Sequence, residues 1–402
     1  MSTQQKAPAL LMLGALATFF VANCSFIVNP ALSSLAKVYS DIPYSTVLLI
    51  ATLTAGCMIP GSLISGAITG TKVKYKTMTI LSMLCVIVGG VLPYFIHTFS
   101  FVIVMRALVG IGIGLAMPIA NTLVMKLFTG DTRANMSGWG NAAMQLSGIV
   151  YQIVAGVVCL RNVNYVWLVH GILIIPLVLV LLFLEEPEKE EPVQATAATA
   201  ETTAEGKRAR IPASAVFSAV GFGIIFMCFY PVLLNLSTIL ANEGIGNSAL
   251  AGTISSIFTA GGFVAGMIFG KVYKGAKIIV IPLALLFWTA GIGMFSITKS
   301  VPLMAISVIL CGVAINWIWP ATIVGFDGFV PAEKISLASA LFVSGMTLGC
   351  FISSFYISFV AQVTGSSNPR APIAVGFWIV LITSIIWTIV ELRKKPAKAT
   401  FA

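Results

Sequence analysis

The sequence predicts an all-α membrane protein with twelve transmembrane helices. Apolar residues make up 58% of the 402 residues and charged residues only 9%, whereas about a quarter of the residues in a soluble domain are charged. The apolar residues lie in long stretches, and about 20 of them in a row span a bilayer as a helix. Lipid admits only helices and closed barrels, and these stretches are too long for barrel strands.

The predicted spans are separated by prolines, glycines and charged clusters. They cover residues 9–36, 43–69, 77–97, 100–127, 135–160, 164–184, 213–240, 247–271, 277–298, 301–326, 335–362 and 371–391. The first span is too long for a signal peptide and has no small-residue cleavage pattern, so we keep it as the first helix.

A polar segment divides the spans into two sets of six. It reads EEPEKEEPVQATAATAETTAEGKRARIP, and such a composition cannot bury enough apolar surface to offset chain entropy. We therefore predict an N-terminal bundle over 1–184, a disordered cytoplasmic linker over 185–212 and a C-terminal bundle over 213–402.

The distribution of basic residues sets the expected orientation. With the N-terminus inside, 18 of the 23 lysines and arginines lie on the cytoplasmic side and 4 on the outer side, as the positive-inside rule requires. We expect both termini in the cytoplasm and the protein in the inner (plasma) membrane. The net charge of +10 then reports topology and gives no reason to expect a nucleic-acid partner.

The two halves of the chain repeat each other. Gly66, Gly70 and Lys74 recur as Gly266, Gly270 and Lys274 at an offset of 200 residues. Further matches at offsets of 201 or 202 follow in order along the halves: Pro30 with Pro231, Met117-Pro118 with Trp319-Pro320, Arg133 with Lys334, and Gly148 with Gly349. Several matches in order indicate an internal repeat.

Two bundles of six helices, a cytoplasmic linker and a repeated basic loop resemble the major facilitator superfamily over the whole chain. The resemblance implies alternating access around a substrate site between the halves, near the membrane midplane. In the family's loop pattern Gly66, Lys74 and Lys76 match, but Gly70 replaces an acid, so Asp131, Asp327 or Glu333 would have to substitute. The expected gating residues are Gly66, Lys74, Lys76, Gly266, Lys274, Asp131 and Arg133. Gly66 and Gly266 are expected to allow close contacts between the second and eleventh or the eighth and fifth spans.

The fourth span also resembles the family, through Arg106 followed by Gly110, Gly112 and Gly114. Small residues at this spacing favour close helix packing. The fifth span lacks the Gly-Pro pattern common in family members that export drugs in exchange for protons, which counts against that class.

Acidic residues are expected only at helix ends, in loops and in the linker. Coupling to protons by a midplane carboxylate is therefore not expected. His170 lies inside the sixth span, where we expect a packing role, and the seven cysteines are expected to act as small apolar residues. No metal or cofactor site is predicted.

Arg106 is the charge that must enter the membrane, roughly 8 Å deep at about 1.5 Å per residue. Two interpretations are open. The guanidinium could be held by helix 1 carbonyls with Asn23 or Asn29, or it could attract an anionic substrate through its bidentate fork.

Polar and aromatic residues of the first, fifth, seventh and tenth spans complete the expected substrate site. With Arg106 they are Asn23, Asn29, Gln145, Gln152, Tyr230, Asn235, Asn316, Trp317 and Trp319. The aromatic residues favour an organic molecule over a hydrated inorganic ion.

The sequence thus predicts a secondary transporter that moves a small organic anion, such as a carboxylate, by uniport or exchange. A proton-coupled exporter of amphipathic compounds is the main alternative, and a sensor that kept a transporter fold is a weaker one. We expect a monomer in the lipid bilayer, and no enzyme, because no nucleophile and base pair lies at membrane depth.

Overall fold

Helices dominate the computed structural model, which describes residues 8–187, 212–276, 279–326, 330–331 and 334–393. Within these residues twelve helical spans are long and apolar enough to cross a membrane. Each predicted span is matched within a few residues, which confirms the expected fold class. The helices are α1 (Pro8–Ala17), η1 (Thr18–Ala31), α2 (Leu32–Val38), α3 (Tyr44–Val47), α4 (Leu49–Ile68), α5 (Tyr75–Val91), η2 (Leu92–Tyr94), α6 (Phe99–Leu127), α7 (Gly130–Cys159), α8 (Tyr165–Leu168), η3 (Val169–Leu173), α9 (Ile174–Phe183), α10 (Ala213–Leu234), α11 (Leu236–Asn242), α12 (Ser248–Ala276), α13 (Val280–Ile297), α14 (Val301–Phe326), α15 (Ile335–Thr364) and α16 (Ala371–Arg393).

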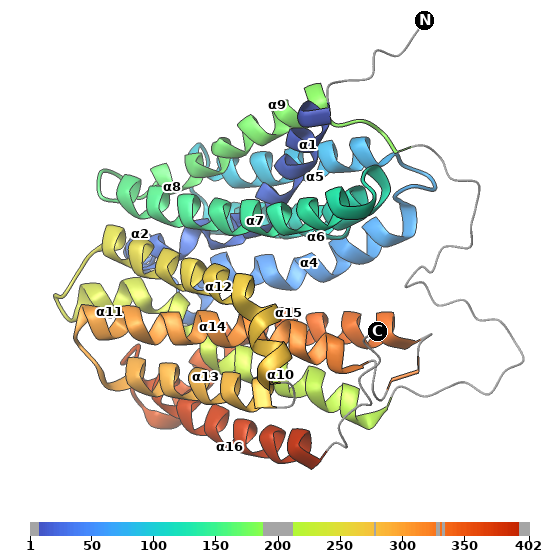
Figure 1. Cartoon of the computed structure of the whole chain (residues 1–402). Helices are drawn as coiled ribbons and strands as arrows, with labels where there is room; N and C mark the ends of the chain where they lie inside the picture. Colours follow the sequence, from blue (N-terminus) through green and yellow to red (C-terminus); the bar gives the residue numbers. More distant parts are fainter. Residues whose placement is uncertain (1–7, 188–211, 277–278, 327–329, 332–333, 394–402) are drawn as a thin grey trace, which may run out of the picture. The chain divides into compact units, whose positions relative to one another are not determined.

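The chain divides into two compact units, which we call unit 1 (Met1–Ala200) and unit 2 (Glu201–Ala402). In Figure 1 the helices of unit 1 run from blue to green, and those of unit 2 from yellow-green to red. Most of the predicted linker, residues 188–211, lies outside the described residues.

Equivalent helices pack together in each unit. In unit 1, α6 packs on α4 and α5, α7 packs on η1, and α1 packs on α9. In unit 2, α14 packs on α12 and α13, α15 packs on α10, and α10 packs on α16. The repeat found in the sequence is therefore a repeat of helix packing.

Glycines hold the closest helix contacts inside each unit. A Cβ atom added at Gly114 would lie 2.3 Å from the carbonyl oxygen of Met58, so α6 and α4 touch backbone to backbone. In unit 2 a Cβ atom at Gly349 would lie 2.2 Å from the carbonyl oxygen of Gly223. The packing role expected for the glycines of the fourth span is confirmed.

Among the described spans, four are not regular α-helices, and the third span of the chain ends in the short 3₁₀ helix η2. The first contains the long 3₁₀ helix η1, which includes Asn23, Asn29 and Pro30. The sixth contains the short 3₁₀ helix η3, which includes His170. The seventh, expected to be continuous, is interrupted at Asn235 between α10 and α11, four residues after Pro231. Long 3₁₀ segments inside membrane helices are unusual and often accompany functional sites.

The repeated basic loop differs between the units. In unit 1, α4 ends at Ile68 and residues 69–73 form a turn in which Thr69 pairs with Val73. In unit 2, α12 continues through Gly270 and Lys274 to Ala276, so the expected loop after residue 271 is helical there. The aromatic rings of Phe269 and Tyr273 contact each other at a centroid distance of 5.4 Å. An aromatic pair at this i, i+4 spacing supports a helix, whereas β-branched Thr69 and Val73 favour extended backbone.

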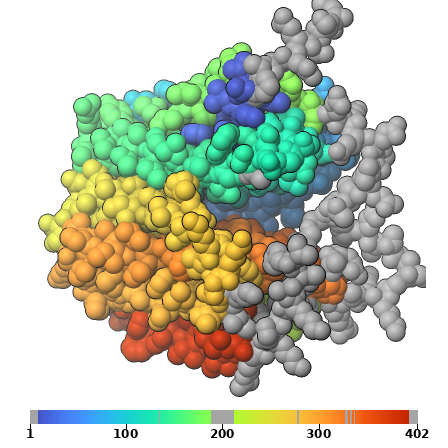
Figure 2. Space-filling view, in the orientation of Figure 1, coloured from blue at the N-terminus to red at the C-terminus, as the bar shows by residue number. Residues whose placement is uncertain are grey.

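The surface of the spans carries many exposed apolar side chains. Leu63, Met267 and Ile297 are 69%, 71% and 83% exposed, and they are spread over helices from both units. In the space-filling view the orange and red helices of unit 2 form a continuous surface (Figure 2). Such an apolar exterior suits contact with lipid.

Candidate functional site

Arg106 lies in α6 and is fully buried inside unit 1. Its Nε donates to the carbonyl oxygen of Ile50 in α4 at 2.7 Å, and its Nη2 donates to the carbonyl oxygen of Ser25 in η1 at 3.4 Å. Its Nη1 lies 3.1 Å from Nε2 of His170. One guanidinium thus connects four different spans of the bundle.

His170 accepts a hydrogen bond from Arg106 through its uncharged imidazole ring. An arginine can only donate, so Nε2 of His170 must accept, and the ring proton then resides on Nδ1. Nδ1 lies 3.1 Å from the carbonyl oxygen of Trp167, which accepts that proton. A Cβ atom at Gly90 would lie 2.1 Å from Cγ of His170, so only glycine at this position of α5 leaves room for the ring. The packing role expected for His170 is real but incomplete, because the ring also orients Arg106.

The first span meets the fifth along a polar contact. Nδ2 of Asn23 donates to the carbonyl oxygen of Met144 in α7 at 2.7 Å. The hydroxyl of Tyr151 donates to the carbonyl oxygen of Phe20 at 3.2 Å. Gly148 lies directly against Asn23, since a Cβ atom there would be 2.7 Å from Nδ2. These contacts fix η1 on α7, just as Arg106 fixes η1 on α4 and α6.

The remaining candidates of unit 1 differ in exposure. Asn29 and Gln152 are buried, and Nε2 of Gln152 donates to the carbonyl oxygen of Gly148 at 2.9 Å. Gln145 is half-buried, one full heptad before Gln152. The two glutamines share a face of α7, as their spacing predicts.

The candidates of unit 2 lie in α10, α14 and the break between α10 and α11. Tyr230 and Asn235 are buried, and Asn235 donates to the carbonyl oxygen of Pro369 at 2.8 Å. Nε1 of Trp317 donates to the carbonyl oxygen of Ala265 at 3.1 Å, and Nδ2 of Asn316 donates to that of Gly312 at 3.0 Å. The structure therefore gives these side chains partners within unit 2.

Trp319 is half-buried and packs edge-on against an aromatic cluster. Its ring centroid lies 6.3 Å from that of Phe222 and 6.4 Å from that of Phe342. The rings of Phe222 and Phe342 themselves stack at 4.2 Å. Trp319 thus rests on a rigid aromatic base, with part of its side chain accessible.

The family model of the Major Facilitator Superfamily matches residues 14–274, more than half of the chain. The chain belongs to the major facilitator superfamily. As a member of this family it is a secondary transporter, as the resemblance implied, and not an enzyme. Its described residues form twelve helices that are long and apolar enough to cross a membrane.

Individual relatives are distant. The "Protein TsgA homolog" of Buchnera aphidicola subsp. Baizongia pistaciae (strain Bp) is 25% identical over 144 residues, which cover 36% of this chain and 37% of that protein. The nucleoside transporter NupG is 12% identical with a TM-score of 0.74, covering 95% of this chain and 99% of that one. The human organic anion transporter MFSD10 is 13% identical with a TM-score of 0.64, covering 94% and 98%. The structural likenesses show the fold alone.

The superfamily's loop pattern is altered at Gly70 for a structural reason. Gly70 has a φ of 79°, in the left-handed region that favours glycine. A Cβ atom there would also lie 2.6 Å from the hydroxyl oxygen of Tyr75. An acidic side chain at this position would therefore be strained and would displace Tyr75.

A different acidic residue, Glu186, binds the residues that follow the same loop in unit 1. The two carboxylate oxygens of Glu186 accept hydrogen bonds from the backbone N–H groups of Tyr75 and Lys76, at 2.7 and 2.8 Å. The ammonium of Lys76 donates to the carbonyl oxygen of Leu181 at 2.9 Å. Residues 185–187, which composition assigned to the linker, are thus held against unit 1.

The other expected gating residues lie at the same end of their units. Asp131 is exposed in the first turn of α7, and Nε of Arg133 donates to the carbonyl oxygen of Phe128 at 2.7 Å. Lys74 and Lys274 are exposed. Asp327 and Glu333, the other expected substitutes for the acid, lie outside the described residues.

The contacts expected at Gly66 and Gly266, between the second and eleventh or the eighth and fifth spans, would join the two units and stay a prediction. Within its own unit neither glycine makes a close contact. A Cβ atom at Gly66 would have no neighbour within 4 Å, and one at Gly266 would meet only Oδ1 of Asn316 at 3.6 Å. The tight contact of α4 lies more than one turn earlier, at Gly61, where a Cβ atom would be 2.5 Å from the carbonyl oxygen of Ile111.

Sequence reasoning missed the partners of two residues. The bond between Arg106 and His170 joins spans that are 64 residues apart, and no periodicity links them. Glu186 stood within an acidic run, which hid its specific role. The one available signal was the missing acid at position 70, which implied that another acid had to serve the loop.

Proposed function

We propose that this transporter carries a small organic anion, such as a carboxylate, across the membrane by uniport or exchange. The observation that supports this most is the position of charge within the spans. Arg106 is a buried cation in the fourth span, whereas the carboxylates of the described helices lie in terminal turns, at Asp131 and Glu391. A membrane interior with this charge distribution favours anions.

Arg106 would act mainly through its charge. Its guanidinium is fully buried and its hydrogen bonds go to Ile50, Ser25 and His170, so a bidentate contact with substrate would require these bonds to break. A unit charge still attracts an anion about 8 Å away by about 2 kcal/mol at an effective dielectric constant of about 20. We infer that Arg106 raises the local potential and holds the first span in place.

Direct contact with the substrate would then fall to accessible candidates. Gln145 in unit 1 and Asn316 and Trp319 in unit 2 are half-buried. An amide can donate to a carboxylate, and the indole of Trp319 offers an apolar surface to the organic part of the substrate. Asn23, Gln152, Tyr230 and Asn235, which are more buried, would support these side chains.

The orientation belongs to the same proposal. We infer that both termini face the cytoplasm of a cell whose inner or plasma membrane holds the protein, because basic residues resist translocation.

A thermal-shift screen of the purified protein tests the substrate class. A ligand that binds only the folded state raises its melting temperature. We expect small organic acids to raise it, and matched amines and neutral metabolites of the same size to leave it unchanged. A response to amines or neutral compounds alone would contradict the proposal.

A further inference from the structure

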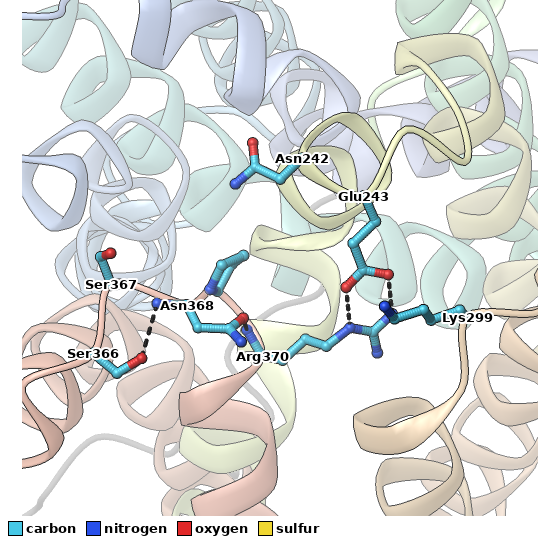
Figure 3. A pocket seen from close by; sticks show the side chains of 8 residues that line it. Asn242, Glu243, Lys299, Ser366, Ser367, Asn368 and Arg370 are labelled. Carbon is cyan, nitrogen blue, oxygen red and sulfur yellow. Dashed lines mark hydrogen bonds and ion pairs between the residues drawn. The ribbon is translucent and has the colours of Figure 1, made fainter.

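A polar pocket opens at one end of unit 2, in the loops that follow the seventh, ninth and eleventh spans. Its volume is about 510 Å³, and its lining is Asn242, Glu243, Lys299, Ser366, Ser367, Asn368, Pro369 and Arg370 (Figure 3). Successive spans run in opposite directions, so the three loops lie at the same end of unit 2. This end is opposite Pro212, where the first helix of unit 2 begins. Pockets of 300 to 1,000 Å³ are about the size that holds a small molecule.

The carboxylate of Glu243 is fully engaged by Arg370. Nη2 of Arg370 donates to Oε2 of Glu243 at 2.9 Å, and Nε donates to Oε1 in a second, shorter bond. Nη1 of Arg370 donates to the carbonyl oxygen of Phe295 at 2.6 Å. Arg370 and Glu243 therefore neutralise each other, and the carboxylate has little capacity left to bind a cation.

Lys299 gives the pocket its excess charge. The lining contains one carboxylate, one guanidinium and one ammonium, so its net charge is +1. The side chain of Lys299 is exposed and lies beside the ion pair of Glu243 and Arg370 (Figure 3), so its ammonium adds a positive charge at the pocket mouth.

The loop of residues 366–370 is fixed by its own hydrogen bonds. The N–H of Asn368 donates to Oγ of Ser366 at 3.2 Å, and the N–H of Arg370 donates to Oδ1 of Asn368 at 2.9 Å. Asn235, in the break between α10 and α11, donates to the carbonyl oxygen of Pro369. Figure 3 shows the side chains of Ser367 and Asn242 lying apart from the ion pair. A preformed loop binds a ligand at a lower entropic cost than a flexible one.

We propose that this pocket is an accessory binding site for an oxyanion, a carboxylate or a phosphate group. The ammonium of Lys299 would contact the anion through a charge-assisted hydrogen bond. The site is separate from the transport site and does not depend on the charge of the transported substrate.

Two sources supply such an oxyanion. A small acid or inorganic phosphate could enter from solution, or a phospholipid headgroup could enter from the membrane surface. Ile297, two residues before Lys299, is 83% exposed and offers an apolar surface for an acyl chain at the edge of the pocket. The experiment must separate these sources.

Titration of the purified protein with inorganic phosphate tests the free anion, because a small carboxylate would also bind the proposed transport site. Lys299→Gln removes the ammonium and keeps a side chain of similar length, and we expect it to weaken binding about tenfold, the loss of one charge-assisted hydrogen bond. Lys37→Gln is the matched control, because Lys37 is another exposed lysine and lies in unit 1. Lys37→Gln should bind the anion as tightly as the parent protein does. This result would show that the effect of Lys299→Gln is not due to the loss of any one positive charge.

Melting temperatures in lipid nanodiscs test the headgroup. Discs of phosphatidylcholine alone are compared with discs that also contain phosphatidylglycerol. A stabilisation by the anionic lipid that Lys299→Gln abolishes and Lys37→Gln retains would assign the headgroup as the ligand. If Lys299→Gln binds both phosphate and anionic lipid as the parent does, the proposed site does not exist.

Discussion

Glu186 binds the first turn of α5 with both oxygens of its carboxylate, accepting from the N–H groups of Tyr75 and Lys76 at 2.7 and 2.8 Å. The first N–H groups of a helix have no partner within it, and the helix dipole favours a negative charge at this end. The contact ties the end of the sixth span to the start of the third. Glu186 also places an acidic side chain at this loop, where Gly70 replaces the acid of the family pattern.

Replacing Glu186 with Gln should therefore lower the stability of the protein. One of the two N–H groups would face an amide NH₂ instead of an oxygen, and the negative charge would be lost. We expect a loss of about 0.5–2 kcal/mol, typical of a helix cap, measured as a lower melting temperature. Glu185→Gln removes the same charge from the adjacent half-buried position. Equal effects of the two changes would show that charge, and not the cap, is responsible.

The ion pair of Glu243 and Arg370 should make stability depend on pH. The hydrogen bonds from Arg370 hold the pKa of Glu243 below its ordinary value. Burial opposes this as the next largest effect, and the charges of Arg370 and Lys299 add to the lowering. Because the folded pKa is lowered, the stabilisation is complete above the unfolded pKa of about 4.3 and is lost as pH falls through the folded value.

Melting curves from pH 7 to pH 3 for the parent and for Glu243→Gln measure this effect. At pH 7 the variant should melt lower, because Arg370 loses its carboxylate, which costs about 1–3 kcal/mol. The difference should shrink below about pH 4.3. A difference that stays constant to pH 3 would show that Glu243 does not titrate with folding.

Two glycines of neighbouring helices should respond in opposite ways to alanine. Gly114→Ala places a methyl group against the Met58 carbonyl, which forces α4 and α6 apart and should cost about 1–3 kcal/mol or more. Gly66→Ala meets no atom of unit 1 within 4 Å and should be neutral or stabilising by up to about 1 kcal/mol, because alanine favours a helix. Melting temperature measures both. A strongly destabilised Gly66→Ala protein would instead support the predicted close contact between the second and eleventh spans.

Sequence predicted the features that repeat along the chain. Continuous apolar stretches located every span, and the matches from Gly66 to Gly349 indicated two equivalent halves, because these patterns are local or periodic. Helix ends were less certain: α12 extends past Gly270 because Phe269 and Tyr273 pair along it, while the equivalent Thr69 and Val73 form a turn. A motif match could not reveal this difference.

Individual polar partners were beyond sequence reasoning. Arg106 was expected to need hydrogen-bond partners inside the membrane. One of them is the carbonyl oxygen of Ser25 in the first span, which accepts from Nη2. The histidine that completes its environment comes from the sixth span, and nothing in the spacing of Arg106 and His170 brings them together. Such contacts depend on the rotation of each helix about its axis, which a mostly apolar helix does not encode clearly.

The last prediction separates the charge of Arg106 from its hydrogen bonds. Arg106→Lys keeps the charge but cannot reach Ile50, Ser25 and His170 together, because an ammonium is a compact donor. We expect a lower melting temperature and nearly normal affinity for an anion. Arg106→Gln loses both, so it should also melt lower and bind the anion at least about tenfold more weakly, given about 2 kcal/mol of lost attraction.

His170→Gln is the matched control for the hydrogen bond alone. The amide oxygen can accept from Arg106 in place of Nε2, so the charge stays and the first span should remain fixed. We expect a small loss of stability and unchanged anion affinity. Melting temperature and affinity are measured on the same samples of all four proteins. If Arg106→Gln melts lower but binds the anion as tightly as the parent protein, Arg106 is a structural residue, and the positive potential cannot be the basis of anion selectivity.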